Sequence, residues 1–507
     1  MKTILSKYIF ITIAVVTLGS CDEEFVTVTP KGAFQESDYY TNEKQATSAL
    51  VGVYDILRKN TGGFENILTV MNSGSDDFYA GGANDSDGLG HQYFSKHALT
   101  PTYIYASLWN DHYQGIYRAN KLLQKLPSIP MDNNLKVRYA AESKALRAIY
   151  YFNLVRMFKN IPLLLEPLTL DNMRTVVQAD PKAVYTQIEK DLVEAIAVLP
   201  VSLPDDELGR ITKVGAQAML GKVYLYDGKN TEAAAVLSEV NGTPGGTNQY
   251  GNHLLEHFED LWKFENEYKF NVESLIEVSH TNNSQTQWGS DAESFGGAAE
   301  GNVANQMIGI REYDKGTTTD TELDLSPGWG FNVVTQDLYD AMQNDNRFHA
   351  TILDLKELKE NGAVTYDAGY QGTGYFLNKF LPRSKDRNQG PGEVDLNFQQ
   401  NSYIIRLADT YLLEAEALGG TGTRAQALLD AVRARVGMPS IPVSLSAIKN
   451  ERRMELAGEG HRFFDLVRWG DAATKLANRG FDAGVDEIFP IPFNEMQGTK
   501  MKQNPGY

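Results

Sequence analysis

Apolar side chains recur with the 3.6-residue period of an α-helix over long parts of this 507-residue chain, and that pattern constrains the fold most. Each such segment carries an apolar stripe that must be buried against a neighbouring element. The sequence therefore predicts a mainly α-helical protein. The periodic segments are 135–158, 181–199, 211–227, 230–240, 403–419, 424–436 and 446–458.

One pair of these segments predicts a closely packed helical hairpin. Gly221 and Ala233 are small enough to let two antiparallel helices approach each other. Tyr224 and Leu237 are spaced to fill the remaining gap, and Gly228 supplies the turn. This spacing resembles a tetratricopeptide repeat, although any helical hairpin is an alternative. The predicted fold class is a mainly α scaffold of tetratricopeptide-like hairpins.

Long irregular stretches separate the predicted helices. They are rich in Gly, Asn, Ser, Thr and Asp, which favour turns and loops. Loops of this length in a compact protein are usually functional or disordered. We therefore expect long irregular loops with minor β-structure to carry a binding surface. The stretches are 59–104, 241–252, 279–335 and 361–402.

The N-terminus has the features of a bacterial lipoprotein signal peptide. Lys2 and Lys7 precede an apolar run at 8–18, which is too short to span a bilayer. The run ends in small residues before Cys21, the only cysteine of the chain, and this junction is similar to a lipobox. Residues 1–20 are therefore predicted to be removed, and Cys21 to be acylated. Several acyl chains would anchor the protein stably to a membrane.

The three acidic residues after Cys21, residues 22–24, resemble the export signal of Bacteroidetes surface lipoproteins. We therefore expect an outer-membrane protein that faces the cell exterior. No later stretch approaches 18 consecutive apolar residues, so the lipid is the only membrane anchor that the sequence predicts.

The charge balance argues against nucleic acid as a partner. Lys and Arg total 47 against 65 Asp and Glu, a formal net charge of −18. Nucleic-acid backbones and anionic membrane surfaces both attract basic patches, which this balance disfavours. A single cysteine also excludes disulfide scaffolds and cysteine-rich zinc sites.

Two short motifs have the residue types of metal sites. Residues 253–257 read H-x-x-E-H, which on a helix would place two imidazoles and a carboxylate on one face. Chance occurrence on an amphipathic segment is the favoured alternative. Residues 84–88 resemble the start of a calcium loop, but its twelfth position is Ser95 instead of Glu. We predict no cofactor, and a calcium ion held by this loop is the alternative.

Residues 451–470 are the densest cluster of charged and aromatic side chains. Glu459, His461 and Asp465 could act as acid, base and orienting group of a hydrolase. Arginines accompany the carboxylates, however, and this composition favours a buried network of ion pairs. Paired carboxylates remain ionised and are poor general acids at neutral pH. The sequence therefore predicts a binding protein and not an enzyme.

Several strings in a fixed order are similar to the SusD/RagB family of Bacteroidetes outer-membrane lipoproteins. They are Leu108–Tyr113, Ala141–Arg156 with Pro162-Leu163, Ile404–Asp409 with Glu414–Leu418, Val432–Arg435, the 451–470 cluster, and Phe489–Pro492 through Asn504–Tyr507. The resemblance implies tetratricopeptide-like helices, capture of a glycan at the cell surface, and delivery to a SusC-like TonB-dependent transporter. It also implies an N-terminal region at 21–240 and a C-terminal region with the ligand-binding loops at 241–507. A RagB-like peptide-binding component is the alternative.

The candidate ligand contacts follow from sugar chemistry, because the family signatures are mostly scaffold. Sugar rings stack on aromatic side chains, and their hydroxyl groups need donors and acceptors. Trp109, Trp262 and Trp469 lie in helical or signature contexts and are expected in the core. The candidates are Trp288 and its neighbour Gln287, the glycine-flanked Trp329, and Asp77, Phe78 and Tyr79.

Overall fold

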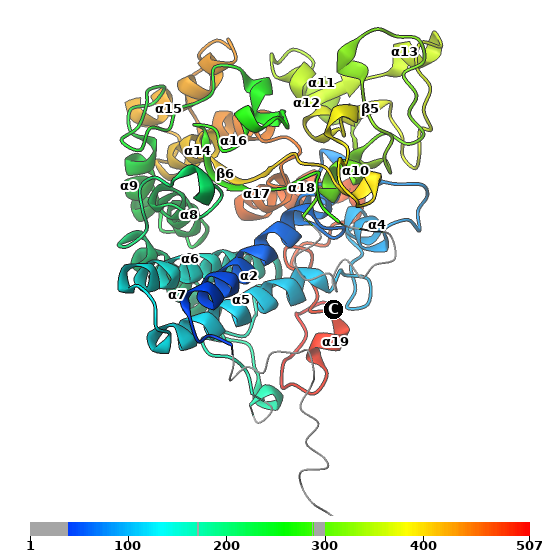
Figure 1. Ribbon diagram of the computed structural model, residues 1–507. Helices are drawn as coiled ribbons and strands as arrows, with labels where there is room; N and C mark the ends of the chain where they lie inside the picture. The colour runs from blue at the N-terminus through cyan, green and yellow to red at the C-terminus, as the bar shows by residue number, and fades with distance from the viewer. Residues whose placement is uncertain (1–38, 170–171, 286, 288–299) are drawn as a thin grey trace, which may run out of the picture.

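The structure is a computed structural model that describes residues 39–169, 172–285, 287 and 300–507. Its regular structure is mainly helical with little strand, as the periodicity predicts (Figure 1). The longer helices form one continuous stack in which each packs against the next: α2 on α5, α5 on α6, α6 on α7, α7 on α8, α8 on α9, α9 on α14 and α14 on α15. Their bounds are α2 Glu43–Gly62, α5 Ser107–Lys125, α6 Asn133–Phe158, α7 Pro181–Ile196, α8 Lys213–Tyr226, α9 Asn230–Asn241, α14 Leu407–Ala417 and α15 Gly422–Arg435.

Local sequence signals set the ends of the long helices. Asp132 caps α6 by accepting hydrogen bonds from the backbone N–H groups of Asn134 and Leu135. The helix ends at Phe158, and Lys159 follows with a positive φ of 59°. The prediction of a helix over 135–158 is therefore confirmed to within two residues.

The predicted hairpin is formed by α8 and α9. A Cβ atom on Gly221 would lie 2.4 Å from Cγ of Leu237, so only glycine allows this approach. Ala233 and Leu237 are completely buried, and Gly228 makes the turn with φ of 73°. The tetratricopeptide-like packing of this pair is confirmed.

In the described part of the chain, strands form three two-stranded antiparallel sheets, two of which join distant segments. One prediction is wrong here, because 403–419 is not a single helix. Residues Ser402–Arg406 form β6, which pairs with β2, and α14 begins only at Leu407. Backbone pairing with a distant strand overrides the local helical pattern. The sheets are β1 Phe78–Gly81 with β3 Phe331–Val334, β2 Ser274–Val278 with β6 Ser402–Arg406, and β4 Ile352–Asp354 with β5 Tyr375–Leu377.

The stretches predicted as irregular contain short elements as well as loops. Their helices are too short to give a clear periodic signal. The remaining α-helices are α3 Ile67–Ser73, α4 Leu89–Ser95, α10 Val303–Ile308, α11 Gln336–Met342, α12 Phe348–Thr351, α13 Lys356–Glu360, α16 Leu445–Glu455, α17 Arg462–Trp469, α18 Ala472–Lys475 and α19 Phe493–Met496. Figure 1 shows α10 to α13 clustered on the side of the molecule away from α8 and α9.

One large apolar core runs from α2 through α9 into β2, β6 and the helices α14 to α17. The N-terminal and C-terminal regions therefore share buried surface. A second core fills the cluster around α11, β4 and β5. The division of the chain near residue 240 stays a prediction.

A buried network of ion pairs lies where β6 meets α16. The guanidinium group of Arg406, only 1% exposed, binds Glu273, Glu455 and Glu459 at 2.6 to 2.9 Å. Burial alone would raise the pKa of Glu455, yet Arg435, Arg406 and Arg347 together hold it well below its usual range. This confirms the structural interpretation of the 451–470 cluster, because its carboxylates are paired with arginine side chains.

Candidate functional site

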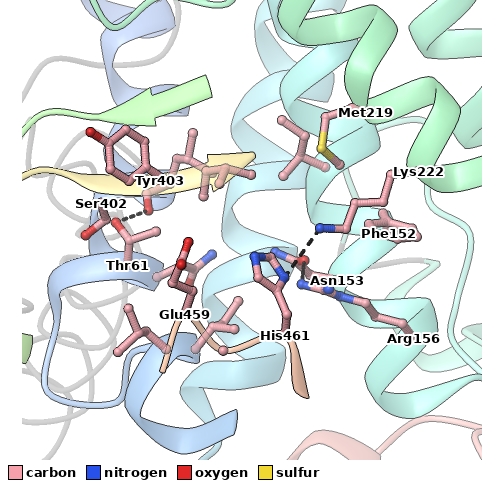
Figure 2. A pocket seen from close by; sticks show the side chains of 17 residues that line it. Thr61, Phe152, Asn153, Arg156, Met219, Lys222, Ser402, Tyr403, Glu459 and His461 are labelled. Atoms are coloured by element: carbon pink, nitrogen blue, oxygen red, sulfur yellow. Dashed lines mark hydrogen bonds between the residues drawn. The ribbon is translucent and has the colours of Figure 1, made fainter. Parts of the chain in front are cut away.

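A small cavity collects several titratable groups between α2, α6, α8 and β6 (Figure 2). Figure 2 shows Lys222 extending from α8 toward His461, and its Nζ lies 3.5 Å from Nδ1 of that histidine. The same Nζ donates to Oδ2 of Asp409 at 2.9 Å. The cavity has a volume of about 60 Å³, which is room for a few water molecules and too little for a sugar ring.

The geometry does not support acid–base catalysis at this cavity. Burial, reinforced by the Lys222 ammonium, lowers the pKa of His461 to about 3, so the imidazole is neutral at physiological pH. Asp465, the proposed orienting group, accepts hydrogen bonds from Arg452 at 2.8 Å and Arg468 at 3.0 Å. These groups belong to the ionic scaffold.

A partly exposed pair of stacked aromatic rings is the strongest candidate for a ligand platform. The rings of Phe64 and Trp329 are almost parallel, with an interplanar angle of 5° and centroids 5.8 Å apart. Phe64 is 38% exposed and Trp329 is half-buried. The outer face of an aromatic ring in such a stack is an apolar surface of the kind that stacks on the C–H face of a sugar ring. We call these two rings the aromatic platform.

The backbone around Trp329 explains how the ring is presented. The N–H groups of Gly328, Trp329 and Gly330 donate to the carbonyls of Ile310, Gln306 and Gly309 at 2.7 to 2.9 Å. A Cβ atom on Gly328 would lie 2.3 Å from Cα of Gly309, so glycine is required at that contact. The loop before β3 is thus fixed to the end of α10, and Trp329 is held there against the buried cluster that includes Val303 and Met307.

Polar groups lie beside the platform. Nη1 of Arg311 donates to the carbonyl of Trp329 at 3.3 Å, and its Nε reaches Oδ2 of Asp367 at the same distance. With the Gln306 amide oriented to satisfy its neighbours, its oxygen accepts from Nε1 of Trp329 at 3.2 Å. Asp367 is exposed, so the rim presents a cation and a carboxylate to solvent. Sugar hydroxyl groups can use both.

Phe64 and Arg311 were not predicted from the sequence. Phe64 follows Gly62 and Gly63 at the end of α2, and an aromatic residue after two glycines is the only local signal of exposure. A Cβ atom on Gly62 would lie 2.3 Å from Cε1 of His280, so His280 packs directly against this end of α2. The pairing of Phe64 with Trp329 depends on such distant contacts.

The segment that carries Gln287 is held by another loop. Gln287 is exposed, and its Nε2 donates to the carbonyl of Pro391 at 2.8 Å. The N–H of Gln389 in turn donates to the carbonyl of Asn282 at 3.2 Å. Trp288 lies outside the described residues, so its predicted role stays a prediction.

The Asp77–Tyr79 prediction needs correction. Asp77 and Phe78 are completely buried, so their side chains cannot meet a ligand from solvent. Asp77 pairs with Arg453 at 2.7 Å, and Phe78 packs in the second core. Tyr79 is half-buried, with the Arg479 guanidinium 4.6 Å from its ring centre. The segment anchors β1 to C-terminal helices, a role that its local composition does not distinguish from binding.

The expectations for the other motifs can also be compared with the structure. Trp109 is 3% exposed and belongs to the core, whereas Trp262 and Trp469 are half-buried. Residues 253–257 are not helical, so the spacing that would align two imidazoles is lost. Among the described residues, no three His, Cys, Asp or Glu side chains lie together so that they could hold a metal ion.

Burial of one carboxyl group beside these loops predicts a pH-dependent stability. Asp386 is 1% exposed, and burial raises its pKa to about 7 even though Oδ1 accepts from the N–H of Gln399 at 2.9 Å. An unfolded aspartate titrates near pH 4, so the folded chain binds more protons between about pH 4 and 7. The contribution of Asp386 to the free energy of unfolding therefore falls as pH rises through that window.

Asp386→Asn should remove this dependence, because the amide oxygen still accepts from Gln399 and carries no charge. We expect the variant to have a higher Tm than wild type at pH 8 and a similar Tm near pH 4. Thermal melts of both proteins at the two pH values test this. A difference in Tm that is the same at both would contradict the assignment.

Comparison with known proteins agrees with this architecture. Residues 272–507 match the model of the SusD family, and residues 24–225 match a model described as starch-binding associating with outer membrane. The solved structure of a laminarin binding SusD-like protein is 59% identical, and the match covers 92% of this chain and 100% of that one with a TM-score of 0.89. The chain belongs to the SusD family.

Other members are more distant. The SusD-like protein P25 of Formosa agariphila is 25% identical, and the match covers 94% of this chain and 94% of that one. Surface glycan-binding protein A from Bacteroides fluxus is 27% identical, with a TM-score of 0.78 over 92% of this chain and 100% of that one. Membership of the SusD family makes this chain a binding protein and not an enzyme. In the described part of the chain, no helix has both the length and the apolar character needed to cross a membrane.

Proposed function

We propose that this SusD-family protein captures a neutral β-1,3-glucan of the laminarin type at the cell surface. The observation that carries the proposal is the 59% identity to a laminarin binding relative along the whole length of that relative. The aromatic platform supports it independently, because it presents two parallel rings beside Arg311 and Asp367. Stacking on C–H faces together with charged hydrogen-bond partners is the chemistry that recognises a sugar chain.

The proposed contacts combine the platform with two residues of the sequence prediction. Phe64 and Trp329 stack on sugar rings, and Arg311 and Gln287 bind hydroxyl groups. Trp288 is retained as a proposed contact on sequence grounds alone. Tyr79 is not included, because Arg479 lies over its ring.

Affinity electrophoresis in gels that contain laminarin, starch or xylan tests the ligand class. We expect migration to be retarded by laminarin and much less by the other two. Isothermal titration against a tryptic peptide digest examines the RagB-like alternative. Binding of peptides with no retardation by any glycan would overturn the proposal.

We further propose that the protein is anchored to the outer membrane through acylated Cys21, faces the exterior, and delivers its ligand to a SusC-like TonB-dependent transporter. Cys21→Ala should release a folded, soluble protein, because the lipid is the only anchor that the sequence provides. Fractionation of cells that lack the transporter measures this. If the variant stayed with the membranes under those conditions, the anchor would lie elsewhere.

A further inference from the structure

A large groove lies in the C-terminal region, apart from the aromatic platform. It has a volume of about 860 Å³, within the range of small-molecule binding sites, and shares no lining residue with the platform. Its walls come from residues 259–265, from 321–324 and from the region of α12 and β4. In Figure 1, α12 lies in the upper part of the molecule, whereas α10, which supports Trp329, lies lower in the view.

The walls of this groove are held rigidly. The N–H of Ser384 donates to the carbonyl of Asp324 at 2.9 Å, and Nδ2 of Asn378 donates to the carbonyl of His349 at 2.8 Å. Nη1 of Arg383 joins the same walls by donating to the carbonyl of Glu322 at 2.9 Å. These contacts fix three separate segments around one space, so little ordering is needed when a ligand binds.

Polar groups of the groove are left without partners. Nε1 of Trp262 and Oε2 of Glu265 are buried atoms that have no hydrogen-bond partner among the described residues. Arg383 donates only to neutral oxygens, because its other acceptors are Oδ1 of Asn378 at 2.7 Å and the carbonyl of Asn378 at 3.4 Å. No carboxylate of the described chain forms an ion pair with it. Burial lowers the pKa of Arg383, as expected for a cation without such a partner. Buried polar atoms without a partner carry a desolvation cost, which a hydrogen bond to a ligand or a water molecule would offset.

The groove offers donors and acceptors together with aromatic rings. An N–H donor, a carboxylate acceptor and a guanidinium line one space with the half-buried rings of Phe264 and Phe348. None of the large apolar side chains that are exposed on the described surface lines it, which disfavours an apolar protein partner. Acidic lining side chains outnumber basic ones, which disfavours sulfated or uronic-acid chains. Neutral hydroxyl-rich molecules match this combination best.

We propose that this groove is a second, independent binding site for a neutral oligosaccharide, in which Trp262, Glu265 and Arg383 bind hydroxyl groups. The proposal rests on the proposed function, because it takes the ligand to be a neutral glucan. A chain long enough to reach both sites would bind more tightly than a short one through effective concentration.

Isothermal titration with laminarihexaose and with polymeric laminarin tests the second site. Wild type should bind more than one laminarihexaose, and Trp329→Ala should keep one weak site. The triple variant that combines Trp329→Ala with Glu265→Gln and Arg383→Gln should lose that remaining binding. The two groove substitutions alone should weaken binding of polymeric laminarin about tenfold, because bivalent attachment is lost.

Two further variants distinguish a loss of binding from a folding defect. Trp262→Phe removes the unpartnered N–H and keeps an aromatic ring, and it should reproduce the loss if its thermal melt is near wild type. Lys190→Gln with Glu194→Gln on α7 is a charge-matched control away from the groove, and it should leave glycan binding unchanged although Glu194 also pairs with Lys144.

The outcomes separate the two proposals. A single laminarihexaose site that Trp329→Ala removes, with groove variants that bind like wild type, overturns the second site and leaves the proposed function in place. If wild type binds neither laminarin nor any other neutral oligosaccharide, the proposed function fails and the second site fails with it.

Discussion

Arg406→Ala is expected to destabilise the protein by about 3–5 kcal/mol, enough to prevent stable folding of a marginal domain. The guanidinium is 1% exposed and binds Glu273, Glu455 and Glu459. Its removal leaves these buried carboxylates with fewer counter-charges, and a buried charge without its partner costs more than the pair contributes. Chemical denaturation followed by circular dichroism gives the free energy of unfolding.

An exposed ion pair supplies the matched control. Arg387 pairs with Asp395 at 2.7 Å, with the two side chains 37% and 42% exposed. Solvent screens such a pair, so Arg387→Ala should cost less than about 1 kcal/mol. Equal losses of stability in the two variants would show that burial does not determine the contribution of Arg406.

Trp329→Ala is expected to weaken laminarin binding by about 2 kcal/mol, or roughly thirtyfold in Kd. Alanine removes the ring area that stacks on a sugar and leaves Phe64 without its parallel partner. Isothermal titration with laminarin gives the affinity, and a thermal melt of the same preparation reports stability. The loss of stability should be modest, because only part of the ring is buried.

Substitution of the buried Trp109 should have the opposite effect, a large loss of stability with no change in affinity. Trp109 is 3% exposed and packs against Phe158 with ring centroids 5.0 Å apart. Trp109→Ala should cost about 3–5 kcal/mol of stability and leave the affinity of the remaining folded protein unchanged. If Trp329→Ala bound laminarin with wild-type affinity, the Trp329 ring would not be part of the binding site. Phe64→Ala would then test the other ring of the platform.

The helical scaffold could be predicted because its signals are local. Apolar periodicity places α6, α7, α8 and α9 within a few residues of their bounds. The close contact of Gly221 with Leu237 follows from residue size and spacing within one hairpin. The charge composition of residues 451–470 was sufficient to predict paired arginines and carboxylates, since buried charges require partners.

Segments that pair with distant parts of the chain were harder to predict. Residues 403–406 look helical in isolation but form β6, because β2 supplies backbone hydrogen bonds that local sequence does not record. Asp77 and Phe78 look like binding residues in a loop, yet Arg453 and the second core bury them. Local composition does not report burial by elements that are hundreds of residues away.

The sequence by itself determined the family, the helical scaffold, the paired charges and the residue types of a sugar-binding surface. Only the tertiary structure decided which aromatic rings share one surface. Phe64 and Trp329 are 265 positions apart, and they stack because the end of α2 packs on His280 while the loop before β3 is fixed to α10. The physical reason is that periodicity and capping act over a few residues, whereas a binding surface depends on the packing of segments that are distant in the chain.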